Sequence, residues 1–304
     1  MSARRRVWTR LVALVTASGL ALAGALTGAW VALGQPAAQG SVWFEVTGTS
    51  PVESHYWGTP GEPFFFLALG NDGRQDTDPG LGDAIHVIGV NPALHQATIL
   101  DIPRDTLAPD GDKLTSWHAN HGLPGIVTEL DKLLGVQIHY AITTNFPEFT
   151  AMVDEMGGID VVIPEQLHDE DSGAFFAPGP QHLSGDDTLR FARDRKDFAR
   201  GDIVRTFNQG TIILGALATL RAQHPGPAGT AALVAILGRH VRTQNVGIAD
   251  LFRLGRLALS LDPSAVKNVT LPVANPGDGT TNLLPVGADD LLADFRDDGV
   301  LQNH

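Results

Sequence analysis

The sequence contains no cysteine. Disulfide bridges, zinc sites built on thiolates and thiol nucleophiles are therefore all excluded. Basic residues are also in the minority, because 21 Lys and Arg stand against 34 Asp and Glu, for a net charge of -13 with neutral histidine. This acidic balance argues against a general nucleic-acid-binding protein, so no nucleic-acid partner is expected. The nucleotide-binding pattern GxxxxGK(S/T) and the esterase pattern GxSxG are both missing.

The composition is that of a folded α/β protein. With 304 residues, 43% hydrophobic and 18% charged, the chain has enough apolar mass for a sizeable core. Apolar runs typical of strands alternate with helical patterns, which predicts one layered α/β domain without internal repeats. The expected strands are Pro63–Gly70, Ala84–Val90, Ala97–Ile102, Val136–Thr143, Ile159–Ile163, Leu189–Arg193 and Val266–Pro272, and the expected helices are Leu123–Leu134, Phe146–Met156, Asp202–Gln223 and, roughly, 229–242 and 247–260.

The N-terminal segment has the pattern of a membrane anchor. Arginines at positions 4, 5, 6 and 10 precede residues 11–33, which hold no ionisable side chain. As a helix this stretch would be roughly 34 Å long, against about 30 Å of bilayer hydrocarbon. We therefore expect a single-pass cell-membrane protein with residues 1–10 in the cytoplasm, an anchor over 11–33, a linker over 34–62 and an extracytoplasmic domain over 63–304. A cleaved signal peptide is the alternative.

Two aspartates stand at strand ends, where open α/β sheets usually bind ligands. Asp72 follows the first expected strand and Asp83 precedes the second. Two loop carboxylates suit a hard cation such as Mg²⁺, which leaves its other positions to water and substrate phosphate. Turn chemistry explains the Asn-Asp-Gly sequence at 71–73 equally well. His118 and His121 also have a metal-pair spacing, but the sequence offers them no third ligand.

Basic residues concentrate in one window, because six Lys and Arg lie between positions 190 and 205. Arg193 and Arg195 would project from one face of an extended segment. Asp202, Arg205 and Gln209 have the spacing of one helix stripe, and Asp202 is placed to cap that helix. A solvated face, neutralised by the aspartates of the same window, is the alternative reading.

A fourth guanidinium comes from Arg104, which follows Pro103 at the end of an expected strand. Guanidinium groups bind phosphate oxygens bidentately and keep their charge. Arginines 104, 193, 195 and 205, together with two acidic residues and a divalent ion, would form the set that a pyrophosphate requires.

Several of these motifs, in this order, resemble the LytR–CpsA–Psr family. The resemblance rests on Pro103-Arg104-Asp105-Thr106, the Arg193/Arg195 pair, the stripe from Asp202 to Gln209 and the stretch from Asn145 to Val161, and it runs from about Phe64 to Leu220. Membership implies a three-layer α-β-α sandwich around a central, largely mixed β-sheet, preceded by one transmembrane helix. It also implies a hydrophobic groove for a lipid tail.

The resemblance further implies an enzyme, a metal-assisted phosphotransferase. It would move a glycopolymer from a polyprenyl-pyrophosphate carrier to a peptidoglycan hydroxyl and release polyprenyl phosphate. The implied partners are the lipid-linked glycan, peptidoglycan and membrane lipid, and the implied cofactor is Mg²⁺ or Mn²⁺. The alternatives are a lipid pyrophosphatase and a polyprenyl-pyrophosphate-binding or regulatory protein without turnover. A pure binder would need the arginines but not Asp72 and Asp83, which favours turnover.

The family's functional roles carry over to matching positions of this chain. The metal-associated aspartates are Asp72 and Asp83, the pyrophosphate-binding arginines are Arg104, Arg193, Arg195 and Arg205, and the helix-borne polar pair is Asp202 and Gln209. The catalytic set is then Asp83, which would assist deprotonation of the hydroxyl, with Arg104, Arg193 and Arg195. Asn208 stands where many members have another arginine, and Gly82 replaces a common serine, which bears on substrate preference.

An exported domain that handles a polyprenyl tail needs an apolar slot, because each buried CH₂ is worth about 0.8 kcal/mol. We expect this slot to open toward the arginines. Its expected lining is the apolar face of Phe146–Met156, together with Ile203, Phe207 and Ile212–Leu217.

Overall fold

The computed structural model describes residues 61–73, 80–195, 201–223 and 226–302. The expected anchor over 11–33 and linker over 34–62 lie outside these residues, apart from the end of the linker at Gly61 and Glu62. Within the described part of the chain, no helix is both long and apolar enough to cross a bilayer.

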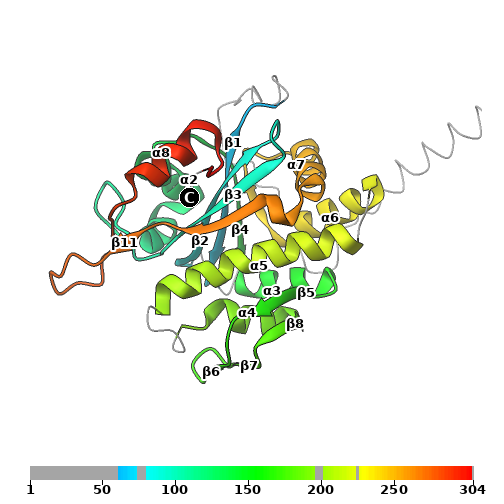
Figure 1. The fold of residues 1–304 in the computed structure, drawn as a ribbon, viewed down its shortest axis with the longest axis horizontal. Coiled ribbons are helices and arrows are strands. Elements are labelled where there is room, and N and C mark those ends of the chain that lie inside the picture. Colours follow the sequence, from blue (N-terminus) through cyan, green and yellow to red (C-terminus); the bar gives the residue numbers. More distant parts are fainter. Residues whose placement is uncertain (1–60, 74–79, 196–200, 224–225, 303–304) are drawn as a thin grey trace, which may run out of the picture. The chain divides into compact units, whose positions relative to one another are not determined.

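A six-stranded sheet is the centre of the fold (Figure 1). Its strand order is β10-β3-β2-β1-β4-β9, with β1–β4 and β3–β10 parallel and the other neighbours antiparallel. The predicted α/β class with a mixed sheet is therefore confirmed. The strands are β1 (Phe64–Asn71), β2 (Gly82–Asn91), β3 (Gln96–Ile102), β4 (Ile138–Asn145), β9 (Arg242–Gln244) and β10 (Val266–Thr270).

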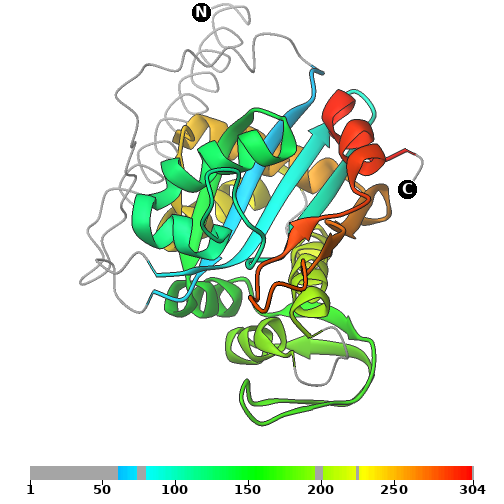
Figure 2. The same ribbon diagram turned by 90° about the vertical axis from the view of Figure 1, so that its left-hand side faces the viewer.

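Helices cover both faces of this sheet because its strands are apolar on both sides. On β1, Leu67 and Leu69 pack into the core beneath α2 (Leu114–Leu134) and α8 (Asp289–Asp298), whereas Phe64 belongs to a second core on the other face. That face is covered by α3 (Phe146–Glu155), α5 (Gly201–Gln223), α6 (Gly226–His240) and α7 (Ile248–Ser260). In Figure 2, α2 lies in front of the sheet and α6 and α7 lie behind it.

A smaller group of elements flanks α5 and has its own core around Phe191, Ile159 and Ile212. The predicted strand Ile159–Ile163 exists as β5, but it pairs with β8 (Gly179–Leu183) and not with the main sheet. Next to it lie the hairpin of β6 (Leu167–Asp169) and β7 (Ala174–Phe176) and the helix α4 (Gly185–Arg193). Near the C-terminus, the 3₁₀ turn η2 (Pro263–Ala265) and the short pair β11 (Val273–Ala274) and β12 (Leu284–Pro285) complete the described elements.

The predicted strand Leu189–Arg193 is wrong, because these residues form the end of α4. Ser184 caps this helix by accepting a hydrogen bond from the Asp187 amide at 3.2 Å. Acidic residues in its first turn and basic residues in its last turn both favour the helix dipole. Consequently Arg193 ends a helix and Arg195 lies in the segment after it, so the two do not share the face of an extended strand.

Two further helical segments differ from the sequence prediction. The predicted helix Leu123–Leu134 is the second part of α2, which begins at Leu114 and kinks at Gly122, where φ is 67°. The left-handed glycine and Pro124 interrupt the helical pattern, which is why the first part went unpredicted. Helix α8 was not predicted at all, although Leu291, Leu292 and Phe295 bury its apolar face.

Candidate functional site

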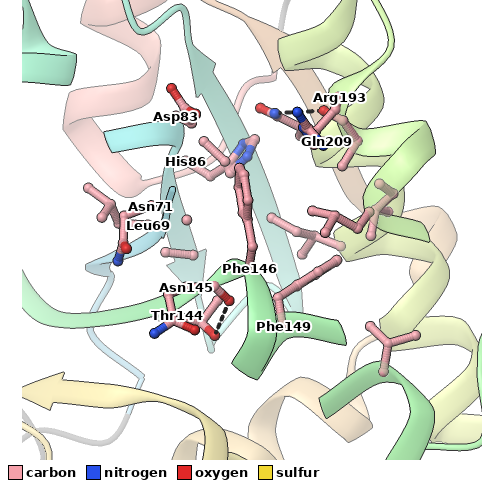
Figure 3. Close-up of a pocket in the computed structure, with 18 of the residues that line it drawn as sticks. Leu69, Asn71, Asp83, His86, Thr144, Asn145, Phe146, Phe149, Arg193 and Gln209 are labelled. Atoms are coloured by element: carbon pink, nitrogen blue, oxygen red, sulfur yellow. Dashed lines mark hydrogen bonds between the residues drawn. The ribbon is translucent and has the colours of Figure 1, made fainter. Parts of the chain in front are cut away.

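A cavity of about 480 Å³ lies between the sheet and the helices α3, α4 and α5. Its polar end lies at the carboxyl ends of β1, β3 and β4 and the start of β2, and its other end is apolar. Figure 3 shows Asp83, Arg193 and Gln209 toward one end of it and Phe149 toward the other. The lining includes seven of the eight predicted site residues, namely Asp72, Asp83, Arg104, Arg193, Arg195, Arg205 and Gln209.

Asp202, the remaining predicted site residue, is not part of the lining but forms ion pairs with two of the arginines. Its Oδ1 is 2.8 Å from Arg205 Nη2 and 3.8 Å from Arg104 Nε. The predicted stripe on α5 is therefore present. The Asp202 carboxylate, in the first turn of this helix, pairs with the guanidinium groups of Arg104 and Arg205.

Arg104 connects the end of β3 to the start of β2. Its Nη1 donates a hydrogen bond to Asp83 Oδ1. Burial lowers the pKa of Arg104, but the carboxylates of Asp83, Asp202 and Asp105 together raise it above its ordinary value. The guanidinium group therefore stays charged at this edge of the sheet.

Arg205 is the most buried of the four arginines, with 6% of the residue exposed. Burial lowers its pKa, Asp202 raises it, and the positive charges of Arg104 and Arg195 lower it again. Its Nη2 is paired with Asp202 Oδ1, but its Nε makes no hydrogen bond to any described residue, and neither does Arg104 Nε. Buried N–H groups of a charged side chain are costly without an acceptor, so this end of the cavity is built to bind an anion.

The other polar residues of this end come from α4, α5 and the β6–β7 hairpin. Arg193 lies over the Phe146 ring, with Cζ 5.4 Å from the ring centre. The Arg195 amide donates to the buried Asp169 at 3.4 Å, which fixes the backbone after α4. Gln209 Nε2 donates to the Ala192 carbonyl at 2.9 Å, so α5 and α4 are joined beside the arginines.

The two predicted metal-associated aspartates lie on neighbouring strands, because Asn71 pairs with Gly82 in the β1–β2 register. Asp72 Oδ1 accepts the Leu81 amide at 2.6 Å, and Asn71 Oδ1 accepts the Gly73 amide at 3.0 Å. Two carboxylates beside a cluster of arginines fit Mg²⁺, which takes one or two carboxylates and leaves room for phosphate oxygens. Across the described residues, no three His, Asp or Glu side chains group as metal ligands. Of the histidine pair, His118 bonds the Gly80 carbonyl and His121 stacks on Trp117.

The other end of the cavity is an apolar slot between the sheet and α3, α5 and α6. Of the residues predicted to line it, Phe146, Phe149, Met152, Ile212 and Ile213 do so. Ile203, Phe207, Leu214 and Leu217 do not line it, and Phe207 is 43% exposed because it faces outward from α5. The strands contribute Phe66, Ile88 and Ile142, and α6 contributes Leu237.

Three features of the cavity were missed in the sequence. Asn71 donates to Thr143 Oγ1 at 3.0 Å across β1 and β4, and Asp169 supports Arg195 from the hairpin. His86 Nδ1 lies 2.7 Å from Asp101 Oδ1 at the cavity floor. The available signal for this last pair was a histidine and an aspartate within the apolar stretches Ala84–Val90 and Ala97–Ile102.

The sequence also matches known proteins. It is 37% identical over 161 residues to the polyisoprenyl-teichoic acid–peptidoglycan teichoic acid transferase TagU of Bacillus cereus, covering 51% of this chain and 52% of that protein. The identity to the TagU of Halalkalibacterium halodurans is 31% over 188 residues, 60% of this chain and 61% of that protein. The chain thus matches about half to three fifths of the length of these curated relatives.

Solved structures share the fold. The crystal structure of TagV from B. subtilis covers 78% of this chain and 96% of its own, with a TM-score of 0.65 and 24% identity. A LytR-Csp2A-Psr enzyme from Actinomyces oris covers 78% and 90%, with a TM-score of 0.63 and 24% identity. The family model of the LytR_cpsA_psr family matches residues 44–291. With that match spanning most of its length, the chain belongs to the LytR_cpsA_psr family.

Proposed function

We propose that this protein transfers a glycopolymer from a polyprenyl-pyrophosphate carrier to a hydroxyl group of peptidoglycan and releases polyprenyl phosphate. The observation that carries the proposal is the continuity of one cavity, which joins a cluster of four arginines, of which Arg205 is buried, to an apolar slot. A lipid pyrophosphate has the same two parts in the same order. The name of the matching relatives specifies teichoic acid as the polymer and peptidoglycan as its acceptor, which supports this substrate class.

The arginines would bind the pyrophosphate. Arg205 and Arg104 present buried N–H donors without hydrogen-bond acceptors in the described structure, and Arg193 and Arg195 lie at the same end of the cavity. Asp202 and Gln209 would hold this cluster in place through Arg205 and Ala192. Donors fixed before the reaction stabilise developing charge without reorganisation, which is commonly the largest contribution to such catalysis.

The transfer step would take place at the polar end of the cavity. The hydroxyl oxygen forms a bond to the glycan-side phosphorus, and the bond from that phosphorus to the bridging oxygen breaks. The bridging oxygen leaves with the electron pair as part of polyprenyl phosphate. The hydroxyl proton goes to a carboxylate, for which Asp83 is placed beside Arg104. Catalysis then depends on positioning and charge stabilisation.

Mg²⁺ or Mn²⁺ would be held by Asp72 and Asp83 together with phosphate oxygens. When bound, such an ion neutralises charge on the pyrophosphate. Asp83 would then serve both the ion and Arg104, and the Asp72 carboxylate is already oriented by the Leu81 amide.

The site of action would be the outer face of the cell membrane. The basic residues before the uncharged stretch 11–33 support an anchor with residues 63–304 outside. Such an anchor would keep the slot close to the bilayer, so that a lipid tail need only be partly withdrawn from the membrane.

A transfer assay tests this proposal. The full-length protein is incubated with a short-chain polyprenyl-pyrophosphate-linked saccharide and a soluble peptidoglycan fragment, and products are separated by mass. A saccharide phosphate joined to the fragment supports the transferase. Release of free saccharide phosphate only, with or without the fragment, identifies a lipid pyrophosphatase. Tight binding with neither product identifies a binding or regulatory protein.

A further inference from the structure

His86 and Asp101 form a buried pair at the floor of the cavity. They stand opposite each other in the β2–β3 register, with His86 Nδ1 2.7 Å from Asp101 Oδ1. His86 is 3% exposed and Asp101 0%. Helix α5 closes over the pair at Gly210, because a Cβ there would lie 2.4 Å from Asp101 Oδ1. His86 itself lines the cavity, as Figure 3 shows.

The strand register places His86 at the boundary between the two ends of the cavity. Side chains at alternate positions of β2 share one face, so His86 lies between Ala84 and Ile88 there. Their partners on β1 are Gly70 for Ala84, Ala68 for His86 and Phe66 for Ile88. The Ala84 side adjoins Asp83 and the arginines, and the Ile88 side is the slot. A lipid pyrophosphate bound in this cavity therefore has its lipid-side phosphate next to His86.

The pair has two unused hydrogen-bonding groups, and one of them, Asp101 Oδ2, is buried away from the cavity lining. Asp101 occupies Nδ1, while Nε2 of the same ring has no partner among the described residues. Burial raises the pKa of Asp101 to about 6, although its hydrogen bond with His86 lowers it. Nε2 is a donor whenever the ring carries a proton there. The charged groups around the same cavity are Asp72, Asp83, Asp169, Asp171, Arg104, Arg193, Arg195 and Arg205.

We propose that His86 is a substrate-contacting residue that donates a hydrogen bond from Nε2 to the phosphate that stays with the lipid. Asp101 is its positioning residue, which fixes the ring through Nδ1. This inference rests on the function proposed above. In the transfer step, the departing polyprenyl phosphate gains negative charge when its bond to the glycan-side phosphorus breaks. The His86 donor faces this phosphate, and the acceptor hydroxyl approaches from the polar end.

Binding of geranyl phosphate, a short mimic of the leaving lipid phosphate, tests the contact. Its Kd is measured on the full-length protein by calorimetry. Loss of a hydrogen bond to a charged group weakens binding about 10- to 100-fold, so His86→Leu is expected to raise the Kd by at least the lower figure. His86→Gln keeps an N–H donor of similar reach, and should restore most of both binding and kcat. His121→Leu, on α2 and outside the cavity lining, is the matched control.

The outcomes separate this inference from the proposed function. If the wild-type protein does not bind geranyl phosphate, the proposed function itself fails. If the wild type binds but His86→Leu binds equally well, only the role of His86 is overturned. If His86→Gln is as inactive as His86→Leu, a donor is not what the site needs, and the assignment is again overturned.

Asp101 is tested by a double-mutant cycle with Asp101→Ala and His86→Leu. Because both residues act through one contact, the double variant should lose little more binding than His86→Leu alone. Additive losses would contradict the positioning role. If a variant fails to fold, NMR of the wild type tests the same contact. The ¹⁵N resonance of His86 Nε2 should then shift on addition of geranyl phosphate. An unchanged resonance in the saturated protein would overturn the contact.

Discussion

Asp202 and Arg205 form an ion pair across one turn of α5, with Oδ1 2.8 Å from Nη2. The pair is unequal, because Arg205 is almost wholly buried while a quarter of the Asp202 side chain is exposed. Burial lowers the pKa of Arg205, and its Nε has no hydrogen-bond acceptor in the described structure. The fold thus keeps a buried charge at this site that its own residues satisfy only in part.

This relationship predicts that Arg205 contributes to activity and not to stability. Arg205→Met should lower transfer turnover about 10²-fold, the scale of losing a fixed charge-stabilising group. The melting temperature should change little, because loss of the buried Arg205 charge offsets loss of the ion pair, and Asp202 keeps Arg104 and partial exposure to water. Turnover and thermal unfolding measure the two effects. Arg221→Met, on the same helix but at the surface, is the control, and a variant at 205 that unfolds earlier with normal turnover would contradict the account.

Removal of divalent metal should stop turnover. Activity should disappear in EDTA and return with added Mg²⁺ or Mn²⁺, and Asp72→Asn or Asp83→Asn should each cost about 10²-fold because a carboxylate ligand is lost. Asp110→Asn, at an exposed loop, serves as the control. Full turnover in EDTA would show that the two aspartates have another role.

We expect a substitution that fills the slot to lower the turnover of substrates with long lipid tails. Ala216 lines the slot from α5, and Ala216→Phe should fill it. Turnover of a long-chain substrate should fall at least tenfold, whereas binding of inorganic pyrophosphate should be unchanged, because each CH₂ excluded from the slot forfeits up to about 0.8 kcal/mol. Ala218→Phe, which places the same ring on the exposed side of the helix, is the control. Equal turnover of long-chain substrate by both variants would place the lipid tail elsewhere.

We expect His139 to cause part of the loss of stability at acid pH. Burial lowers its pKa from 6.5 to about 4, and its Nδ1 accepts the Phe65 amide at 3.2 Å. The unfolded chain therefore binds a proton at this residue between about pH 6.5 and pH 4, whereas the folded chain does not, so stability decreases as the pH falls through this range. His139→Asn keeps an acceptor but cannot titrate, and urea unfolding should show a smaller loss from pH 7 to pH 4.5. An identical loss in wild type and variant would rule out this assignment.

How far the sequence predicts this molecule depends on the range of the interactions. The predicted strand Pro63–Gly70 and helix Phe146–Met156 correspond to β1 and α3, because local apolar patterns determine both elements. The end of α4 was missed because Leu189-Arg190-Phe191 alternates apolar and polar side chains as a strand does, although Ser184 and the acidic first turn are local helix signals.

For the candidate site as well, local motifs could be predicted from the sequence, whereas contacts between distant segments could not. The arginines were predicted from spaced motifs, and the structure places them together even though Arg193 is helical rather than extended. The His86–Asp101 pair is not visible in the sequence, because it arises from the register of two strands. Likewise, the outward orientation of Phe207 depends on how α5 packs on β10, which no local pattern encodes.

The central claim is that one cavity binds both the pyrophosphate and the lipid tail. A crystal structure of the protein with geranyl pyrophosphate tests it most directly. The account predicts both phosphates among Arg104, Arg193, Arg195 and Arg205, with the tail between α3 and α5 beyond His86. A structure with the phosphates bound elsewhere, or with the tail outside the slot on the surface of the domain, would contradict it.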